Sequence, residues 1–507
     1  MLSIDVSATA FAASFVVVGL ALFWTSGFRD LKFPPGPKRI PVAGCALVMP
    51  TRNEHQTFSR WADEFGRIVG LKVFGQRLVL LNTSEVATEL LNTRSSIYSY
   101  RPNFPMLEMM SFPKWNVGIM NTGSTHRSAR KILSQSMNPK AIHLYHDIMA
   151  NEVRCLLKYI RDSPSEYARH LRRLNANIIL RIFYGVQPDR VETENLVTLN
   201  NKLLDATSLA GAPLAYLVNT FPILKYWPRF LPGGSFKADV EVGSRLVEEL
   251  FTIPIIPVNT KEANLNFTSA RQWTMPFLSM HSGDKSQRNL ARSVAATAFS
   301  AGVETSTSML LSFVLAMVLY PDVQRKAQSE IDARLSGALP TVKDRLDTLP
   351  YMDAILSECF RWAPPGHLGL PHCLSQDDSI NGYILPRGTM VLPNIWNILH
   401  DSRRHRNPME FMPERFLGAN PEPDPREHVY GYGRRLCPGR YLAEDNLWLA
   451  MANMLTLFQF QMALDADGQP LSPTVEFTSG VMNRPRDFKC LIEPRSLEIW
   501  GLIPHKS

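Results

Sequence analysis

Cysteines are few in this sequence, and none of them are clustered. The six lie at positions 45, 155, 359, 373, 437 and 490 of 507 residues. This scatter excludes a zinc site built on paired cysteines and a small disulfide-rich scaffold, and it fits a reducing compartment. No low-complexity segment and no repeat of fixed period is visible, which argues against solenoids and propellers. With 45% hydrophobic and 20% charged residues, the chain is expected to bury one large core.

A strong excess of charge is likewise missing. The formal net charge is +8, and no basic run is interleaved with aromatic residues. Nucleic acid is therefore not expected as a partner.

Residues Val6 to Phe28 carry no charge at all. At about 1.5 Å per residue, a helix over this stretch would span roughly 35 Å, enough to cross a bilayer. A cleaved signal peptide would need a basic segment first, but the residues before Val6 include Asp5 and no Lys or Arg. We therefore expect a retained transmembrane anchor. Arg29 and Lys32 follow it and place the rest of the chain on the cytosolic side.

The remaining chain reads as a stiff hinge and a mostly helical body. Pro34, Pro35 and Pro37 restrict the backbone after the anchor. Alternating apolar residues over 68–81 predict a short hairpin, whereas the pattern over 140–365 is mostly helical. The expected fold class is mainly α with small β-sheets. The expected parts are an anchor over 1–28, a proline-rich hinge over 29–40 and a catalytic domain over 41–507.

One cysteine stands in a glycine-rich loop. Residues 430–439 read Tyr-Gly-Tyr-Gly-Arg-Arg-Leu-Cys-Pro-Gly, and an apolar helical pattern follows from Tyr441 to Phe458. The dipole and free N–H groups at the start of that helix favour a thiolate at Cys437, which could serve as a metal ligand. Considered alone, such a residue is more often a buried core cysteine.

The spacing in this loop is more specific than the cysteine itself. It resembles the haem-ligating loop of the cytochrome P450 superfamily at five positions: Tyr430, Gly433, Arg435, Cys437 and Gly439. Tyr430 stands where the superfamily usually has Phe. The resemblance implies the P450 fold and haem b, with Cys437 as the axial ligand of the iron. It also implies that Arg435 pairs with a haem propionate and that both glycines let the backbone pass close to the flat haem.

A long apolar pattern over 289–319 predicts a helix that crosses the domain, and its middle, residues 301–305, reads Ala-Gly-Val-Glu-Thr. A Glu-Thr pair in a helix most often faces solvent. In the superfamily, however, this motif activates oxygen. The resemblance implies that Thr305 hydrogen-bonds O₂ in a gap beside Gly302 while Glu304 supplies protons through water.

Glu358 and Arg361 stand three residues apart on a helix predicted over Tyr351–Trp362, and Arg415 follows further along the chain. A surface ion pair worth about 0–1 kcal/mol is the default interpretation. The resemblance instead implies a buried three-way network of Glu358, Arg361 and Arg415 that supports the haem loop and takes no part in the chemistry.

The haem propionates need cations or donors, and the resemblance implies Arg130, His372 and Arg435. The superfamily normally has a tryptophan four residues before Arg130, where this chain has His126. Whether His126 takes over the hydrogen bond of that tryptophan stays open.

The substrate pocket is less specified. Residues 102–120 are rich in methionine and aromatic residues and predict an adaptable apolar lid, although core packing explains them nearly as well. Residues 365–370 and 478–482 fall where the superfamily lines its pocket, with His367 as an unusual polar group. Few charges fall on these segments, so we expect an apolar, uncharged substrate.

The leading interpretation is a single-pass, haem-thiolate monooxygenase of the endoplasmic reticulum membrane, similar to fungal secondary-metabolism members. It would use O₂ and electrons from NADPH, delivered by an NADPH-cytochrome reductase with FAD and FMN. The acidic surface of the reductase would meet basic residues such as Arg434 and Arg440. A reductase-independent isomerase or dehydratase is an alternative that would not need Glu304 and Thr305. A non-enzymatic haem-binding sensor is another. The motifs do not identify the substrate.

Overall fold

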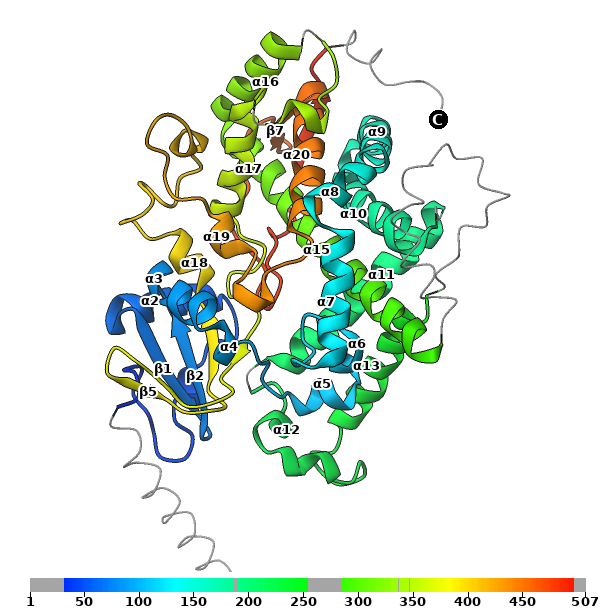
Figure 1. Cartoon of the computed structure of the whole chain (residues 1–507). Coiled ribbons are helices and arrows are strands. Elements are labelled where there is room, and N and C mark those ends of the chain that lie inside the picture. Colours follow the sequence, from blue (N-terminus) through cyan, green and yellow to red (C-terminus); the bar gives the residue numbers. More distant parts are fainter. Residues whose placement is uncertain are drawn as a thin grey trace, which may run out of the picture.

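Helices dominate the computed structural model, which describes residues 32–186, 189–212, 214–253, 284–335, 337–345 and 347–496. The predicted fold class, mainly α with small sheets, is confirmed over this part of the chain (Figure 1). The predicted anchor over 1–28 lies outside the described residues, and the predicted hinge is described only from Lys32 onward.

Long helices form most of the molecule. They are α2 (Glu54–Phe65), α7 (Ser124–Ser136), α9 (His146–Asp162), α10 (Tyr167–Ile179), α11 (Arg190–Gly211), α13 (Phe236–Phe251), α15 (Lys285–Leu319), α16 (Pro321–Leu335), α17 (Pro350–Trp362) and α20 (Arg440–Leu457). Short helices connect them: α3 (Ser84–Thr88), α4 (Ser95–Tyr98), α5 (Pro105–Met109), α6 (Phe112–Trp115), α8 (Pro139–Ile142), α12 (Leu217–Thr220), α18 (Ile395–Leu399) and α19 (Arg426–Val429).

In the described residues, three small sheets accompany the helices. The predicted hairpin over 68–81 is confirmed as antiparallel strands β1 (Ile68–Val73) and β2 (Gln76–Leu81), which join β6 (Met390–Pro393) and β3 (His372–Cys373) in one sheet. β2 runs parallel to β6, so two segments about 300 residues apart in sequence are adjacent. The other sheets consist of β4 (Asp378–Ile380) with β5 (Tyr383–Leu385), and of β7 (Phe458–Leu464) with β8 (Pro470–Leu471) and β9 (Cys490–Pro494).

Helix α15 is the central element. The side chain of Asp284 caps its first turn by accepting a hydrogen bond from the Gln287 N–H (2.9 Å), and Pro321 stands two residues beyond its last residue, Leu319. α15 is long and apolar enough to cross a membrane, but 83% of its apolar stretch is buried inside the protein. It packs against α7, α10, α17 and α20. Residues far apart in sequence therefore meet around α15, and the candidate site is built there.

Candidate active site

The loop that carries Cys437 lies between α19 and α20. The Cys437 N–H donates to the Tyr430 carbonyl (2.8 Å), which closes the loop, and the Arg440 side chain donates to the Cys437 carbonyl (3.1 Å). Tyr430 supports this turn by packing edge-on against Phe360, with ring centres 5.4 Å apart. α20 begins at Arg440, so the sulfur precedes a helix N-terminus, as the sequence predicted.

The pKa of the Cys437 thiol is shifted in the direction opposite to the sequence-based expectation. Burial raises the pKa of its thiol, whereas the Gly439 N–H and the charges of Arg130 and Arg440 lower it. Burial is the largest of these effects, so the protein alone does not favour a free thiolate. Coordination of a metal ion would deprotonate the sulfur outright. The loop therefore suits a metal ligand whose ionisation depends on the metal.

The two glycines of the loop have different surroundings. At Gly433 the backbone has φ +48°, and a Cβ would stand 2.4 Å from the Leu91 carbonyl oxygen. Around Gly439 a Cβ would meet only Met137 at 3.5 Å and the Cys437 sulfur at 4.0 Å. The prediction that both make room for a flat cofactor needs correction for Gly433. A side chain at this position would clash with the Leu91 carbonyl, so glycine is needed there for packing within the protein. Gly439 does lie beside the sulfur.

Arg130, Arg435 and His126 come together next to this loop. Arg130 Nη2 donates to the Leu436 carbonyl (2.7 Å), and Arg435 Nη1 donates to His126 Nε2 (2.8 Å). Since arginine can only donate, His126 is neutral with its proton on Nδ1. Burial, together with the charge of Arg435, lowers the pKa of His126 to about 4. His126 thus joins the two arginines as a neutral ring that carries one N–H.

His372 and Arg101 complete the cluster, and the sequence analysis missed Arg101. His372 Nδ1 donates to the Tyr98 carbonyl (2.8 Å), which leaves a lone pair on Nε2. His372 would therefore need a second proton to bind a carboxylate, and burial, followed by the charge of Arg101, lowers its pKa to about 3. The Arg101 side chain donates to the carbonyls of Gly118, Leu370 and Pro371.

Within the part of the chain that the structure describes, this cluster has no anionic partner. Among the described residues, Arg101, Arg130 and Arg435 form no ion pair with a carboxylate, and burial lowers the pKa of all three side chains. Nη2 of Arg435 is also buried without a hydrogen-bond partner within the described ranges. Buried cations without a counter-charge are costly, on the order of several kcal/mol each. The cluster therefore suits the anionic groups of a ligand, and two haem propionates beside Cys437 fit it.

On α15, Thr305 and its neighbours do not open the predicted gap. Thr305 is half-buried and donates to the Ala301 carbonyl (2.7 Å), one turn earlier. Ala301 is exposed although most of the surrounding helix is buried, so these two residues mark an accessible face. A Cβ at Gly302 would stand 3.2 Å from the Ile179 side chain of α10. Gly302 therefore allows close packing of α10 on α15, which corrects the expectation that it leaves space for O₂.

The side chain of Glu304 contacts different groups from those that Thr305 contacts. Its carboxylate is buried, with 6% of the residue exposed, and lies 3.7 Å from Arg172 Nε and 4.0 Å from Arg484 Nη1. Burial raises the pKa of Glu304; the two arginines lower it, and Asp205 raises it further. A carboxyl group whose pKa is raised can exchange protons closer to neutral pH.

Glu358, Arg361 and Arg415 form a buried network, which excludes the surface ion pair. All three side chains are 0% exposed. Arg361 donates to both Glu358 oxygens (2.7 and 2.8 Å), and Arg415 Nε lies 3.2 Å from the same carboxylate. The Met412 N–H also donates to Glu358 (2.7 Å). Arg361 further binds the carbonyls of Leu399, Pro408 and Glu410. The network thus fixes an irregular segment ahead of the cysteine loop.

A second ionic network was not predicted from the sequence. Arg426 of α19 donates to Ser357 of α17 (2.8 Å) and to Glu444 of α20 (3.2 Å). Arg345 binds Glu444 as well (2.8 Å). Since α19 precedes the cysteine loop and α20 follows it, these contacts hold both ends of the loop against α17. Charged residues scattered over 345–444 carry no motif that would have revealed this arrangement.

Several side chains of the predicted pocket segments are buried. In the lid predicted over 102–120, Met106, Met110 and Trp115 are buried in the main core, so core packing accounts for these side chains. His367, the polar group on the segment 365–370, is buried. Its ring is buried against His55 and Trp396, with ring centres 4.2 and 4.5 Å away.

Comparisons with known proteins extend over nearly the whole chain. The family described as Cytochrome P450 matches residues 34–491. Cytochrome P450 monooxygenase 208 of Postia placenta is 36% identical over 485 residues, which cover 93% of this chain and 92% of that protein. Cytochrome P450 monooxygenase COX2 of Coprinopsis cinerea is 34% identical over 515 residues, 99% of this chain and 97% of that protein. Tryptamine 4-monooxygenase of Psilocybe cyanescens is 32% identical over 485 residues, 93% and 94% of the two chains. The family implies a haem-thiolate cofactor and a redox partner. Because the family match and these relatives span nearly the whole chain, this protein belongs to the cytochrome P450 family and is a cytochrome P450 monooxygenase.

Proposed function

We propose that this monooxygenase oxidises an apolar, uncharged small molecule in fungal secondary metabolism, of a terpenoid, polyketide or indole type. The accessible face of α15 carries the proposal. It consists of Ala301 and Thr305, whereas the neighbouring Glu304 is buried toward two arginines. A substrate against this face would meet methyl groups and one hydroxyl, and no charge. Relatedness to fungal monooxygenases, among them one named for tryptamine, supports the pathway class.

Haem, when bound, supplies the iron chemistry that activates O₂. The residues of the chain have separate tasks. Cys437 would hold the iron from one side, and Arg130, Arg435 and His126 would bind the propionates. Glu304 can hold and release a proton, and the Thr305 hydroxyl can leave its 2.7 Å bond to the Ala301 carbonyl to orient a water molecule or O₂.

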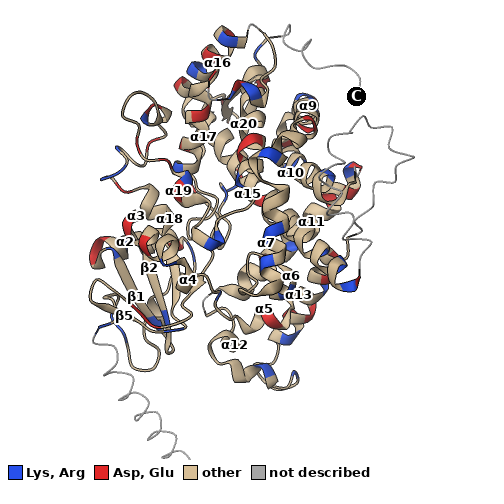
Figure 2. Ribbon diagram, in the orientation of Figure 1, with Lys and Arg blue, Asp and Glu red and all other residues tan. Residues whose placement is uncertain are grey.

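Electrons are proposed to come from NADPH through a reductase with FAD and FMN. Figure 2 shows basic residues along α7, which packs beside the cysteine loop, and Arg127 and Lys131 of this helix are exposed. Arg434 of the loop is exposed too, whereas Arg440 is half-buried and engaged with the Cys437 carbonyl and Tyr441. The basic surface for an acidic partner would thus centre on α7 and Arg434, and electron delivery should slow as ionic strength rises.

Replacing Thr305 with alanine should uncouple the reaction without preventing haem or ligand binding. The test starts from apolar compounds that shift the haem Soret band of the wild type. Product formed per NADPH oxidised should then fall about tenfold in Thr305→Ala, with hydrogen peroxide rising, because a group that aids proton transfer is lost. Thr305→Ser keeps the hydroxyl and serves as the control. Equal coupling in the alanine variant would contradict the assigned role, and a wild type that oxidises no NADPH with reductase would contradict the proposed function.

The enzyme is further proposed to be anchored in the endoplasmic reticulum membrane by residues 6–28, with its catalytic domain in the cytosol. An apolar patch supports this location. It comprises six large side chains that are 42–86% exposed: Leu217, Phe221, Ile223, Tyr226, Trp227 and Phe230. Exposed apolar patches of this kind mark membrane or protein contacts.

The patch lies at the same end of the molecule as the start of the described chain. Phe221 packs against Phe74 of the β1–β2 turn, with ring centres 5.7 Å apart, and the Cys45 N–H donates to Lys72 of β1 (2.7 Å). Val42 and Leu47, close to the hinge, are 74% and 82% exposed. Both regions lie at the lower end of Figure 1, where a membrane could contact them together.

Deleting residues 1–28 should release the protein from membranes after a salt wash while its CO spectrum stays intact. The residual binding of this truncated protein to phosphatidylcholine vesicles should fall at least about tenfold when Ile223→Asp and Phe230→Asp are combined, since two exposed apolar side chains that would enter the membrane are lost. Val191→Asp, at a position 63% exposed on α11, is the control outside the patch. Unchanged vesicle binding would contradict the patch, and loss of haem binding in the truncated protein would place residues 1–28 in the core.

A further inference from the structure

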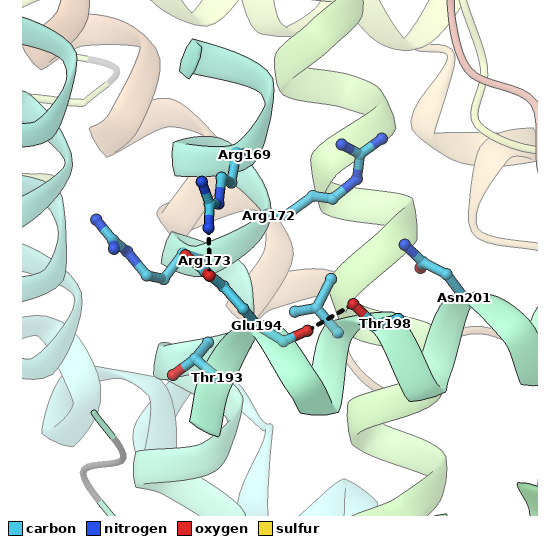
Figure 3. A pocket seen from close by; sticks show the side chains of 8 residues that line it. Arg169, Arg172, Arg173, Thr193, Glu194, Thr198 and Asn201 are labelled. Atoms are coloured by element: carbon cyan, nitrogen blue, oxygen red, sulfur yellow. Dashed lines mark hydrogen bonds and ion pairs between the residues drawn. The ribbon is translucent and has the colours of Figure 1, made fainter. Parts of the chain in front are cut away.

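A polar cavity of about 260 Å³ lies between α10 and α11, away from the cysteine loop. Three arginines of α10 line it, Arg169, Arg172 and Arg173, and Glu194 of α11 is the one acid among its lining residues. In Figure 3, Arg169, Arg173 and Glu194 lie at one end of the cavity, and Arg172 lies at the other. The lining therefore carries an excess of positive charge.

Two of these three arginines have a carboxylate partner. Arg169 pairs with Glu194, and Arg172 Nε lies 3.7 Å from the Glu304 carboxylate. Within the described ranges, Arg173 forms no ion pair with a carboxylate. The positive charge of Arg173 is therefore the one in the lining that has no counter-charge there.

Arg173 also has unused hydrogen-bond donors. The residue is 4% exposed, and its Nη1 and Nη2 are both buried without a hydrogen-bond partner in the part of the chain that the structure describes. Its guanidinium lies 3.4 Å from the ring centre of Tyr159, and the face of an aromatic ring attracts a cation. Burial lowers the pKa of Arg173. Buried polar groups are normally hydrogen-bonded, so Arg173 needs an acceptor at both Nη atoms.

The propionate cluster near Cys437 has the same features. There, Arg435 is buried, has no paired carboxylate and leaves Nη2 without a partner among the described residues. Water in the α10–α11 cavity could accept hydrogen bonds from Arg173, but it would not balance the charge. Adjacent N–H groups of a guanidinium match two oxygens of a phosphate or carboxylate. An oxyanion therefore meets both needs of Arg173.

The position and size of the cavity indicate a small soluble ligand. Its volume is several times the roughly 30 Å³ that one water molecule takes up in the liquid, so it has room for a small organic anion. Its lining residues on α11 lie between positions 193 and 201, whereas the apolar patch begins at Leu217, after α11 ends at Gly211. The cavity is thus separated along the chain from the surface proposed to face the membrane.

We infer that the α10–α11 cavity binds a small soluble oxyanion, a phosphate or carboxylate compound, with Arg173 as its principal ligand. Glu194 opposes this binding by charge repulsion, although Arg169 and Arg190 both pair with its carboxylate and offset much of its charge. An anion that binds only the folded protein stabilises it in proportion to occupancy. Binding is therefore measurable without turnover and without knowledge of the oxidised substrate.

The first test follows thermal unfolding of the full-length holoenzyme, in which haem is expected to fill the propionate site. Inorganic phosphate should raise the midpoint with saturation, relative to sodium chloride at the same ionic strength. Arg173→Met removes the cation but keeps an apolar side chain, and it should show no such rise. Arg325→Met, at an exposed position of α16, is the control and should respond as the wild type does. Equal responses to phosphate and chloride, or a full response in Arg173→Met, would overturn the inference.

The second test measures the affinity for inorganic phosphate by calorimetry. Arg173→Met should weaken binding at least about tenfold, because charge-assisted hydrogen bonds are lost. Arg173→Lys should give an intermediate affinity, since lysine keeps the charge without the planar fork. Glu194→Gln should tighten binding, because the cavity loses its lining carboxylate. If all three variants bind phosphate as the wild type does, the anion binds elsewhere and the inference is wrong.

The kind of ligand is tested by competition. Acetate represents a carboxylate and glycerol 3-phosphate a phosphate ester, and at least one of them should displace phosphate from the wild type. Failure of both would contradict the proposed ligand class. Vesicles that contain phosphatidic acid should bind the wild type and Arg173→Met equally well. Vesicle binding that depends on Arg173 would identify a lipid headgroup and overturn the assignment of a soluble ligand.

Discussion

Replacing Cys437 with serine should abolish the red-shifted Soret band of the reduced, CO-bound protein. Burial already raises the pKa of the thiol at this position, and ionisation there depends on coordination by iron. A serine hydroxyl ionises far less readily than a thiol, so it would stay protonated under the same conditions. The backbone bond from residue 437 to the Tyr430 carbonyl (2.8 Å) does not involve the side chain. The loop should therefore keep its shape while the thiolate signature is lost.

The control for this variant is Cys155→Ser. Cys155 is also partly buried, and burial raises the pKa of its thiol too, but it lies on α9 and outside the loop. Its CO spectrum should match that of the wild type. A Cys437→Ser protein that keeps the red-shifted band would show that another group ligates the iron.

Replacing Arg361 with alanine should yield protein that binds little or no haem. The substitution leaves Glu358, whose side chain is 0% exposed, without its closest cation, and stranding a buried charge costs about 3–5 kcal/mol. That is a large part of the roughly 5–15 kcal/mol by which a domain is stable. The carbonyls of Leu399, Pro408 and Glu410 would also lose their donor. Haem content per protein and the thermal midpoint of unfolding are the measurements.

Arg325→Ala offers a matched control, because Arg325 and Asp322 form an ion pair with the same three-residue spacing. Their side chains are 66% and 75% exposed, and such a surface pair contributes about 0–1 kcal/mol. The control should therefore keep normal haem content. Normal haem content in Arg361→Ala would show that the buried network does not support the cofactor loop.

Local sequence was sufficient to predict those elements that are formed by residues close together along the chain. The hairpin over 68–81, the helix ending at Leu319 and the helix that begins beside Cys437 each follow from apolar periodicity and from residues such as Gly75 and Pro321. The spacing of the cysteine loop identified the family, since it combines five positions within ten residues.

Side-chain environments could not be obtained in this way, because they depend on contacts between distant segments. Glycine at 302 looked like a gap beside the motif, but Ile179 occupies that space. Likewise, Glu304 and Thr305 are adjacent in sequence, yet successive helix positions face different directions, so one meets Arg172 and the other its own helix.

Sequence by itself determined the family, the mainly helical class and which of the six cysteines is the candidate iron ligand, Cys437. Short-range spacing along the chain encodes all three. Only the tertiary structure decided which charges are compensated. Among the described residues, it grouped Arg101, Arg130 and Arg435 without a paired carboxylate, and it buried Glu304 beside Arg172. Electrostatic energy depends on distance and burial in space, and neither quantity can be read from the order of residues along the chain.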